Sequence, residues 1–469
     1  MYYGLVFLLG SAFALAFHFS YLIPLLVCLW FYRDRLISGI LVCLLGFCWA
    51  HFSYTLPKLP EEGVESTGIF IPDSISYSSS PFQRSQVIKG TLKTFGSWKN
   101  IPCRIYAPKN KKRPKSSTYL QVEGKLLQKD HHLYVLKLSQ VENIPKTFSL
   151  AEWRFQIKNQ IRFHLEKRIA GSQNRAFLLS MLTGEIDDRL LAMEFNRLGI
   201  LHLLGISGFQ FALLAFLFGA LLRRFFSFKL SNIVLMILLS AYTFILGDSP
   251  PIERAWIGSM LYLSAQIFGL RISALNALGL ALLWQLIKEP LLIFHLGFQF
   301  SFLCTAAILM TYPLFRSYLS RFFPRRSFSE ASRLSLFDQH GHLLSFFCRE
   351  SLALNGAIHL VTLPLILFHF HKFPLLSLAY NLFLPALVSG IYVLLVLGWV
   401  IPGMHFLTEK LSGFVVKIAT HPPALYDFQL RVHDFPMTIA VITITILLVG
   451  SVYLTQVSDG APGRDLKSP

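Results

Sequence analysis

Long apolar runs, separated by short polar breaks, make up most of this chain. Three runs open it, at Tyr2–Phe17, Tyr21–Tyr32 and Leu36–Phe52. The second run is shorter than the roughly 20 residues that a helix needs to cross a bilayer, so it either tilts against its neighbour or forms half of a re-entrant hairpin. Later runs predict further spans at Ile206–Leu222, Leu230–Gly247, Arg254–Leu270, Ser273–Ile287, His295–Phe315, Leu352–Phe370, Leu375–Ile401 and Phe435–Leu454. The pattern predicts a polytopic α-helical membrane protein.

The apolar runs shorten between Ser53 and Leu150, where turn residues and Lys/Arg become frequent. Apolar and polar residues partly alternate in this segment, which is typical of β-strands. Four or five short strands in so short a segment indicate a small, soluble β-barrel or sandwich inserted after the first spans. The predicted strands are Gln86–Ser97, Ile101–Ala107, Tyr119–Gln128 and His132–Ser139.

A helix with an apolar stripe is predicted next. The stripe consists of Trp153, Ile157, Ile161, Leu165 and Ile169, which recur every four residues, while basic residues lie largely elsewhere around the helix. Two interpretations fit this pattern. The helix lies at the membrane surface, or it packs on the membrane core and turns a solvated face outward. A second surface helix, followed by a linker, is predicted within residues 404–433.

The composition excludes a soluble protein of this size. Of the 469 residues, 54% are hydrophobic and 14% are charged, whereas a soluble globular protein has about 25% charged residues. The formal net charge is +18, which serves membrane orientation and can attract a polyanion. Alternation of the predicted spans places four basic sites on one side: Arg33–Arg35, Arg223–Lys229, Arg271 and Arg316–Arg349. By the positive-inside rule this side is cytoplasmic, which leaves residues 53–150 outside the cytoplasm.

Neither the cysteines nor the histidines form a recognisable metal or disulfide pattern. Most of the six cysteines lie in apolar runs, without a disulfide framework or zinc spacing. His369 and His371 point to different faces of a helix, and no Walker loop, GxSxG or HExxH motif occurs. The sequence therefore predicts no cofactor, no metal and no standard hydrolase site.

Polar side chains at membrane depth are costly and mark candidate functional positions. They occur in the segments Gly199–Gln210, Ser249–Trp256, Gly297–Phe302 and Thr362–Pro385. The glycines of the first segment also fit a tight contact between helices, and the acidic and basic neighbours in the second also fit an ion pair at the membrane interface. The candidate path-lining or path-shaping residues are His202, Ser207, Gln210, Arg254, Gln299 and Asn381.

The β-rich segment is basic and also contains aromatic residues. Between Lys58 and Asp130 it has 13 basic and 6 acidic residues. A cationic groove with aromatic side chains is a common way to hold single-stranded nucleic acid. Docking of the basic loop on anionic lipid is an explanation that is at least as common. The candidate strand-binding residues are Lys89, Lys93, Trp98, Arg104 and Lys112.

Four motifs together resemble the ComEC family of bacterial competence proteins. His202–Gln210 (HLLGISGFQ) is similar to a family segment of the form HLLAISGLH, and Pro250–Trp256 to a proline-then-RA segment. Gly297–Phe302 resembles the GFQLSF segment, and Thr362–Pro385 a late TLP…F…P…NL…P segment. All four occur in the family's order, and Leu178–Glu185 looks like its lead-in to the membrane core.

The resemblance implies an inner-membrane channel of a bacterium that imports single-stranded DNA during natural transformation. It also implies that the β-domain is OB-like and captures the strand. A periplasmic DNA receptor, a separate nuclease and a cytoplasmic DNA-translocating protein would be partners, beside the lipid bilayer, and self-association stays open. The expected organisation is 1–52, N-terminal spans; 53–150, OB-like domain; 151–205, interfacial helices; 206–455, channel core; and 456–469, a polar tail.

Two departures from the family limit what the resemblance implies. Many members have a C-terminal metallo-β-lactamase-like domain with an HxHxDH motif, which is absent from this sequence, so nuclease activity is not expected and the chain is not predicted to be an enzyme. Gln210 stands where the family usually has His, although Gln still donates and accepts hydrogen bonds. The residues alone also leave open a small-solute or lipid-intermediate transporter; a membrane-embedded hydrolase is disfavoured, because acid, base and metal ligands do not cluster.

Overall fold

The computed structural model divides the chain into two compact units, which are described separately. One contains Met1–Ser53, Ile257–Pro385 and Pro423–Pro469, and the other contains Tyr54–Trp256 and Ala386–Pro422. The structure describes residues 1–16, 18–53, 60, 62–79, 84–94, 101–108, 118–130, 133–145, 150–247, 249–323, 326, 330, 332–399, 401, 403–421 and 429–459.

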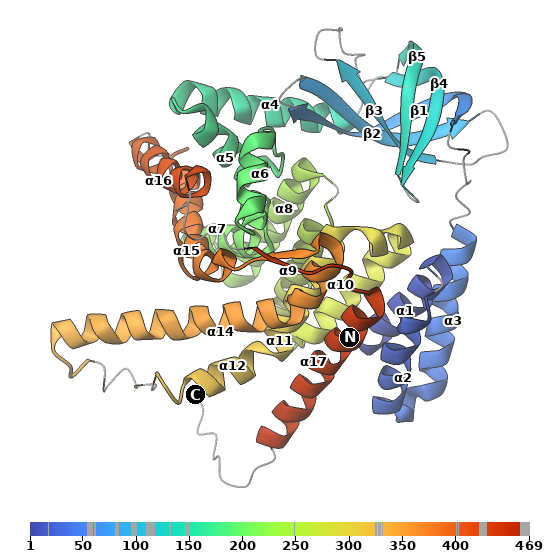
Figure 1. Cartoon of the computed structure of the whole chain (residues 1–469). Helices are drawn as coiled ribbons and strands as arrows, with labels where there is room; N and C mark the ends of the chain where they lie inside the picture. Colours follow the sequence, from blue (N-terminus) through green and yellow to red (C-terminus); the bar gives the residue numbers. More distant parts are fainter. Residues whose placement is uncertain are drawn as a thin grey trace. The chain divides into compact units, whose positions relative to one another are not determined.

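Five strands of the second unit form a closed barrel in the order β1-β2-β3-β5-β4 (Figure 1). The strands β3 and β5 pair in parallel, and the other neighbours pair antiparallel. This five-stranded barrel is the predicted OB-like domain. The strands are β1 (Val64–Ser79), β2 (Arg84–Thr94), β3 (Ile101–Pro108), β4 (Thr118–Asp130) and β5 (Leu133–Pro145).

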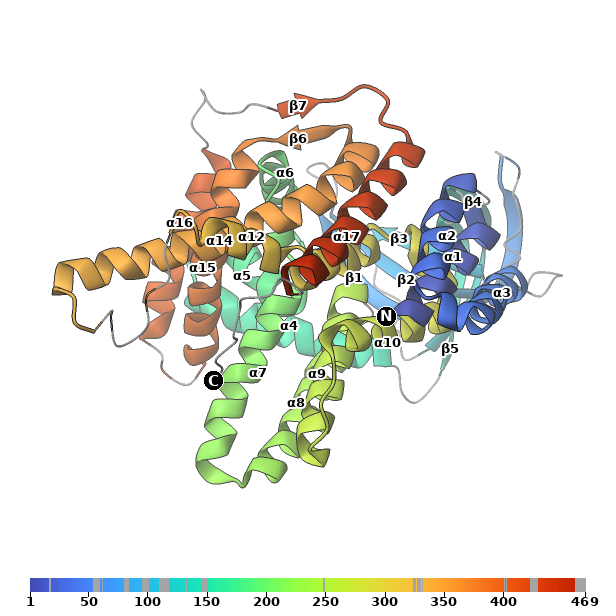
Figure 2. The same cartoon turned by 90° about the horizontal axis from the view of Figure 1, so that it is seen from below.

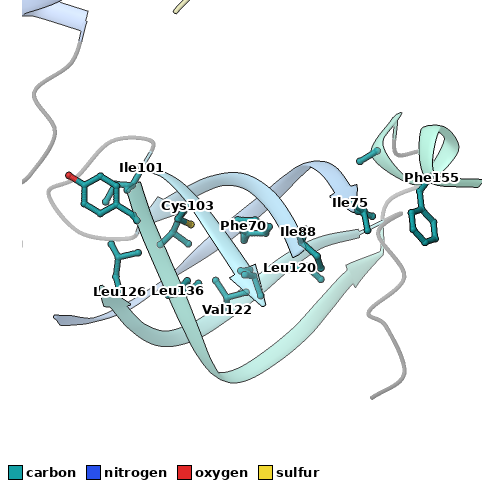
Figure 3. Packing of buried hydrophobic residues seen from close by; sticks show 14 residues of the cluster. Phe70, Ile75, Ile88, Ile101, Cys103, Leu120, Val122, Leu126, Leu136 and Phe155 are labelled. Atoms are coloured by element: carbon teal, nitrogen blue, oxygen red, sulfur yellow. The ribbon is translucent and has the colours of Figure 1, made fainter. Parts of the chain in front are cut away.

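The barrel interior is filled by alternate residues of its strands, because successive side chains of a strand point to opposite faces. Figure 3 shows this cluster, in which Phe70, Ile88 and Leu120 are among the fully buried residues. The predicted strands correspond to β2–β5. No strand was predicted at β1, where Gly68 and Pro72 interrupt the alternation that identifies a strand.

Helix α4 (Leu150–Arg168) is bound to this barrel through its first turns. Its Ala151 and Phe155 belong to the barrel core, and Phe155 lies beside Ile75 at one end of it (Figure 3). The predicted stripe is therefore only partly right, because Trp153 is exposed while Phe155, outside the stripe, is buried. Packing against the barrel end rotates the buried face relative to the one that the four-residue spacing indicates.

The rest of this unit is helical. The helices α5 (Ser172–Thr183) and α6 (Arg189–Arg197) precede a short 3₁₀ turn, η3 (Leu201–Leu203), and the hairpin α7–α8. The predicted surface helix of residues 404–433 is α16, which packs on α5 and α6. The remaining bounds are α7 (Gly208–Phe225), α8 (Phe228–Leu246), α9 (Pro250–Phe268, shared with the first unit) and α16 (Met404–Thr420).

The first unit begins with three helices at the predicted apolar runs. The first and third pack backbone to backbone: a Cβ on Gly10 would lie 2.1 Å from the carbonyl oxygen of Cys43, and one on Gly46 would lie 2.5 Å from that of Phe7. Glycines at such a contact let two helices approach closely in a membrane. The bounds are α1 (Tyr2–Ala16), α2 (Leu22–Phe31) and α3 (Leu36–Ser53).

Beside its later helices, the first unit has a small two-stranded sheet that was not predicted from the sequence. In it β6 (Lys372–Pro374) pairs antiparallel with β7 (Gln429–Arg431), and the two run side by side in Figure 2. The helices are α10 (Ala274–Lys288), α11 (Leu296–Met310), α12 (Tyr312–Leu319), α14 (Leu336–Phe370), α15 (Leu376–Leu397, shared between the units) and α17 (Met437–Asp459).

Among the described residues, six helices are long and apolar enough to cross a membrane, or seven if the bent pair α11–α12 forms one span. The protein is therefore a multi-pass membrane protein, as predicted. The predicted spans at Arg254–Leu270 and Ser273–Ile287 correspond to α9 and α10, which are not among the six. With 15 residues, α10 is about 22 Å long, which is shorter than a hydrocarbon core.

The predicted loop Arg316–Arg349 contains much more helix than expected. It includes the end of α12 and the first part of α14, a helix of 35 residues. Glu350 of α14 joins these helices through its ion pair with Arg316 of α12, and Arg349, its neighbour on α14, pairs with the same carboxylate; both N–O distances are 2.9 Å. The basic residues of this segment therefore serve helix packing as well as charge asymmetry.

Candidate functional site

The outer face of strands β2 and β3 carries cations in adjacent positions. Lys89 of β2 lies directly opposite Arg104 of β3 in the barrel register. Tyr106, two positions further along β3, lies opposite Val87 and is 45% exposed, and exposed Lys93 continues the same face of β2. The structure thus brings three of the predicted strand-binding residues to one face of the barrel.

Lys89 lies in an electropositive environment. Its side chain is exposed, yet the surrounding protein lowers its pKa by partial desolvation, and the charges of Arg104 and Lys158 act in the same direction. Like charges placed directly opposite each other on a sheet are destabilising. Such an arrangement is understandable where an anion from outside the chain supplies the missing charge.

Another face of the same barrel has mixed charges instead. Lys125 of β4 lies opposite Glu65 of β1 on one side and Lys137 of β5 on the other. Glu123 is exposed two residues before it on β4. Near the cationic face, Asp73 of β1 accepts a hydrogen bond from Thr91 Oγ1 at 3.5 Å. The concentration of cations on β2 and β3 is therefore local and is not a general property of the barrel.

Two further predicted strand-binding residues, Trp98 and Lys112, lie outside the described residues. The same holds for the whole basic cluster at residues 109–115 and for the side chain of Tyr119. Their roles stay predictions from the sequence.

Ser207 and Gln210 form a capping box at the start of α7. The backbone N–H of Gln210 donates to Ser207 Oγ at 3.3 Å, and the N–H of Ser207 donates to Gln210 Oε1 at 2.9 Å. Such reciprocal bonds satisfy two of the free N–H groups at a helix N-terminus. Gln210 is 3% exposed, and its side-chain amide thus has a structural role at the position where the family usually has His.

Arg254 of α9 approaches the start of α7. A Cβ added to Gly208 would lie only 2.7 Å from an Nη atom of Arg254 and 3.8 Å from the Cβ of Ala255. Glycine at position 208 therefore makes room for the guanidinium, and the HLLGISGFQ and SPPIERAW segments meet at this point. His202, the other predicted residue of the first segment, is exposed on η3.

A second polar group joins α11 to α14 in the first unit. His369 Nε2 donates to Gln299 Oε1 at 2.7 Å, and Gln299 Nε2 donates to the carbonyl of Ile293 at 2.7 Å. This contact joins the GFQFSF segment to the TLPLILFHFH segment, so two of the four sequence motifs meet here. Gln299 was a predicted path residue, whereas His369 was noted as a polar residue of the late segment and as a metal-ligand candidate but was not predicted to line the path.

Asn381 lies in the first half of α15. Its Oδ1 atom is buried and has no hydrogen-bond partner among the described residues. The predicted path residues therefore fall into separate groups, with His202, Ser207, Gln210 and Arg254 in one unit and Gln299 and Asn381 in the other.

An ion-pair network on α4 was not predicted from the sequence. Lys158 Nζ donates to Glu185 Oε1 and to the carbonyl of Leu246, both at 3.0 Å, while Arg162 pairs with Asp187 and lies 3.8 Å from Glu185. Burial raises the pKa of Glu185. The acidic residues after the LLSMLTGE stretch were a visible signal, but only the fold shows which cations they meet.

A second missed cluster joins α4 to α16 and to the segment before it. The imidazole of His164 stacks on Trp399, with ring centroids 4.2 Å apart, and Arg168 donates to His405 Nε2. Burial, and secondarily the charge of Arg168, lowers the pKa of both imidazoles. In the part of the chain that the structure describes, no group of three or more His, Cys, Asp or Glu side chains is arranged to hold a metal ion.

Comparison with known proteins agrees with the motifs. ComE operon protein 3 of Bacillus subtilis (strain 168) is 25% identical over 276 residues, which cover 56% of this chain and 32% of that protein. An uncharacterized protein MG316 homolog of Mycoplasma pneumoniae (strain ATCC 29342 / M129 / Subtype 1) is 32% identical over 143 residues, covering 30% of this chain and 36% of that protein. The chain thus spans about a third of the length of these curated relatives. No solved structure matches.

The family model described as Competence protein matches residues 183–457. The match begins at the end of α5 and ends within α17, so it includes the capping box, the contact of Arg254 with Gly208, and the Gln299–His369 pair. Because more than half of the chain is matched, the protein belongs to the Competence protein family.

Proposed function

We propose that this protein imports DNA across the bacterial cytoplasmic membrane during natural transformation, as a single strand. The observation that carries the proposal is the outer face of β2 and β3, where Lys89, Lys93 and Arg104 lie with exposed Tyr106. The same face of OB-folds commonly binds oligonucleotides, and cations interleaved with aromatic rings suit a flexible strand.

The membrane core would supply a path with little fixed charge. A strand with one charge per phosphate cannot cross hydrocarbon, so it needs a polar route through the helices. Ser207 and Gln210 in one unit, and Gln299 in the other, are polar groups without formal charge at or in apolar helices. Contacts that are weak and repeated favour transit, because tight binding would stall the strand.

The wider arrangement follows from the same proposal. The barrel would face outside the cytoplasm and receive the strand from a periplasmic receptor, a separate nuclease would degrade the other strand, and a cytoplasmic protein would pull. The chain itself would act as a channel and not as an enzyme.

The test compares the two charged faces of the barrel in the full-length protein. Lys89→Gln and Arg104→Gln should each weaken binding of a labelled oligothymidylate and lower the salt dependence of log K by about 0.7, the value for one phosphate contact to a single strand. Tyr106→Ala should weaken binding by roughly 1 kcal/mol or more if a base stacks on it. The matched control is Lys125→Gln, which removes one cation from the mixed face.

Import of labelled DNA and transformation frequency should decrease in the same order as binding. Equal effects of Lys89→Gln and Lys125→Gln would contradict a binding face on β2 and β3. If deletion of the protein leaves DNA import unchanged, the proposed function is wrong, and transport of a small solute or lipid intermediate becomes the better explanation.

A further inference from the structure

Helix α4 connects the barrel to the helices of the same unit, because it contacts β1 as well as α5 and α8. Ala151 and Phe155 are buried in the barrel core, and Lys158 follows Phe155 by three residues. Residues at this spacing lie on one face of a helix, so Lys158 lies on the side of α4 that faces the barrel. Strand β1, which α4 contacts, pairs its Ser74 with Lys89 of β2.

Lys158 is neutralised inside the protein, whereas the barrel cations are not. Its Nζ and the Glu185 carboxylate are 3.0 Å apart, and both side chains are largely buried, with exposed fractions of 12% and 11%. Lys89 and Arg104 have no ion-pair partner among the described residues. Both Lys158 and Glu185 are near enough to Lys89 for their charges to act on its pKa.

From this juxtaposition we propose that Lys89, Arg104 and Lys158 form one phosphate-binding site for the incoming strand. In the absence of the strand, Glu185 forms an ion pair with Lys158, and a phosphate of the strand replaces Glu185 in this pair. The inference rests on the proposed function and deepens it by naming the point where the strand passes from the barrel to α4. Glu185 is the internal counter-ion of the empty site, and the phosphate oxygens take its place as acceptors for Lys158.

The surroundings of Glu185 favour such an exchange. Burial raises the pKa of its carboxyl group, which means that the carboxylate is poorly solvated where it lies. The single negative charge of a phosphodiester is sufficient to replace Glu185, because the proposed site places it beside the three cations Lys89, Arg104 and Lys158. Arg162, which pairs with Asp187 and also lies 3.8 Å from Glu185, remains to hold the carboxylate after Lys158 moves.

Exposed Tyr106 favours a nucleic acid over a lipid headgroup as the source of the phosphate. It lies two positions from Arg104 on the same strand, about 6.6 Å further along the barrel face. A base adjoining a bound phosphate can stack on this ring, whereas a lipid headgroup has no base to place there.

The decisive experiment uses the sign of the Glu185 effect. The full-length protein in phosphatidylcholine nanodiscs is titrated with labelled oligothymidylate at several salt concentrations. Glu185→Gln should tighten binding several-fold, because Lys158 loses its competitor. Lys158→Gln should weaken binding by about tenfold, the value of one hydrogen bond to a charged group, and lower the salt dependence of log K by about 0.7.

Two matched controls lie on α4, at exposed positions away from the barrel. Glu166→Gln changes the net charge as Glu185→Gln does, and Lys167→Gln changes it as Lys158→Gln does; both should leave binding near wild type. Folding is checked by the thermal unfolding midpoint. A purely structural role for Glu185 predicts weaker or unchanged binding in Glu185→Gln, and either result overturns the inference.

The remaining outcomes separate this inference from the proposed function. If the wild-type protein binds no oligonucleotide at low salt, strand capture by the barrel fails as well. If Lys89→Gln weakens binding while the Lys158 and Glu185 variants behave like their controls, only this inference is overturned. If phosphatidylglycerol in the nanodisc reduces wild-type binding but not binding by Lys158→Gln, the site belongs to lipid headgroups and the assignment to DNA is wrong.

Discussion

The barrel and the helical core use polar side chains in opposite ways. On the barrel, Lys89 and Arg104 lie opposite each other on an outer face and have no ion-pair partner among the described residues. In the helical core, Gln210 is committed to Ser207 and Gln299 is committed to His369. The barrel thus presents cations that no described acidic residue neutralises by an ion pair, while these core side chains use their hydrogen bonds on each other.

This difference indicates separate roles for the two regions. Unpaired surface cations affect binding of an anion but contribute little to folding. Buried hydrogen-bonded groups contribute to folding instead, because removing one partner leaves the other buried without a hydrogen bond, which lowers the stability. Substitutions in the barrel face should therefore reduce strand binding in a folded protein, and substitutions in the core should alter packing or the path itself.

The largest effect is expected where the two core motifs meet. Gly208→Ala would place a methyl group 2.7 Å from an Nη atom of Arg254, which forces the guanidinium out of its position. DNA import should decrease by roughly tenfold or more, the equivalent of about 1.4 kcal/mol. Import of labelled DNA, normalised to the amount of protein in the membrane, measures this effect.

The matched control for this prediction is Gly258→Ala on α9. A Cβ at Gly258 would meet no atom within 4 Å, and alanine stabilises a helix by about 1 kcal/mol relative to glycine, so import should stay normal. Arg254→Ala should impair import as Gly208→Ala does, and Arg254→Lys should not restore it, since lysine lacks the planar fork of donors. Normal import by stable Gly208→Ala and Arg254→Ala variants would remove this contact from the path.

A different effect, on stability and not directly on import, is expected at the Gln299–His369 pair. Gln299→Leu leaves both His369 Nε2 and the Ile293 carbonyl without their partner, which should lower the free energy of unfolding by roughly 1–3 kcal/mol. The thermal unfolding midpoint of the purified protein measures the loss. In the double variant with His369→Leu, the loss should be smaller than the sum of the two single losses. Additive losses would show that the two side chains act independently.

The sequence was sufficient to predict the helical and β-rich segments and to recognise the family motifs. Periodicity of apolar residues located the three N-terminal helices and four of the five strands, because alternation and long apolar runs are properties of local sequence. The strand β1 escaped because Gly68 and Pro72 break its alternation. The start of the 35-residue helix α14 escaped because polar residues interrupt the apolar pattern of its first half. Its ion pair with α12 joins Glu350 to Arg316, which is 34 residues away in sequence.

The chemistry of the candidate site was less accessible from the sequence. The residues Lys89 and Arg104 were selected as cations, but their pairing depends on the register of β2 and β3, which composition does not specify. Gln210 looked like a departure from a family pattern, although Ser207 and Gln210 have the spacing of a capping box, and the geometry identifies this helix cap. Lys158 and Glu185 are 27 residues apart in sequence, so no local pattern could predict their ion pair.

The smallest expected effect is a pH dependence of the thermal unfolding midpoint. His164 and His405 lie near Arg168. Burial lowers the pKa of both imidazoles, and the charge of Arg168 lowers it further. Their stabilising contribution is therefore complete above the ordinary histidine pKa of about 6.5 and is lost as pH falls through the lower pKa of the folded protein. The thermal unfolding midpoint should therefore decrease slightly between about pH 7.5 and 5.5.

His405→Gln tests the source of this pH dependence. Glutamine can still accept a hydrogen bond from Arg168 but does not become charged, so the variant should show a smaller decrease in the midpoint than the wild type over the same pH range. Exposed His433, whose imidazole is fully accessible, provides the control, and His433→Gln should retain the wild-type dependence. An unchanged pH dependence in His405→Gln would show that other groups titrate. The contrast between core side chains that bond to each other and barrel cations without an ion-pair partner would then not extend to the α4–α16 contact.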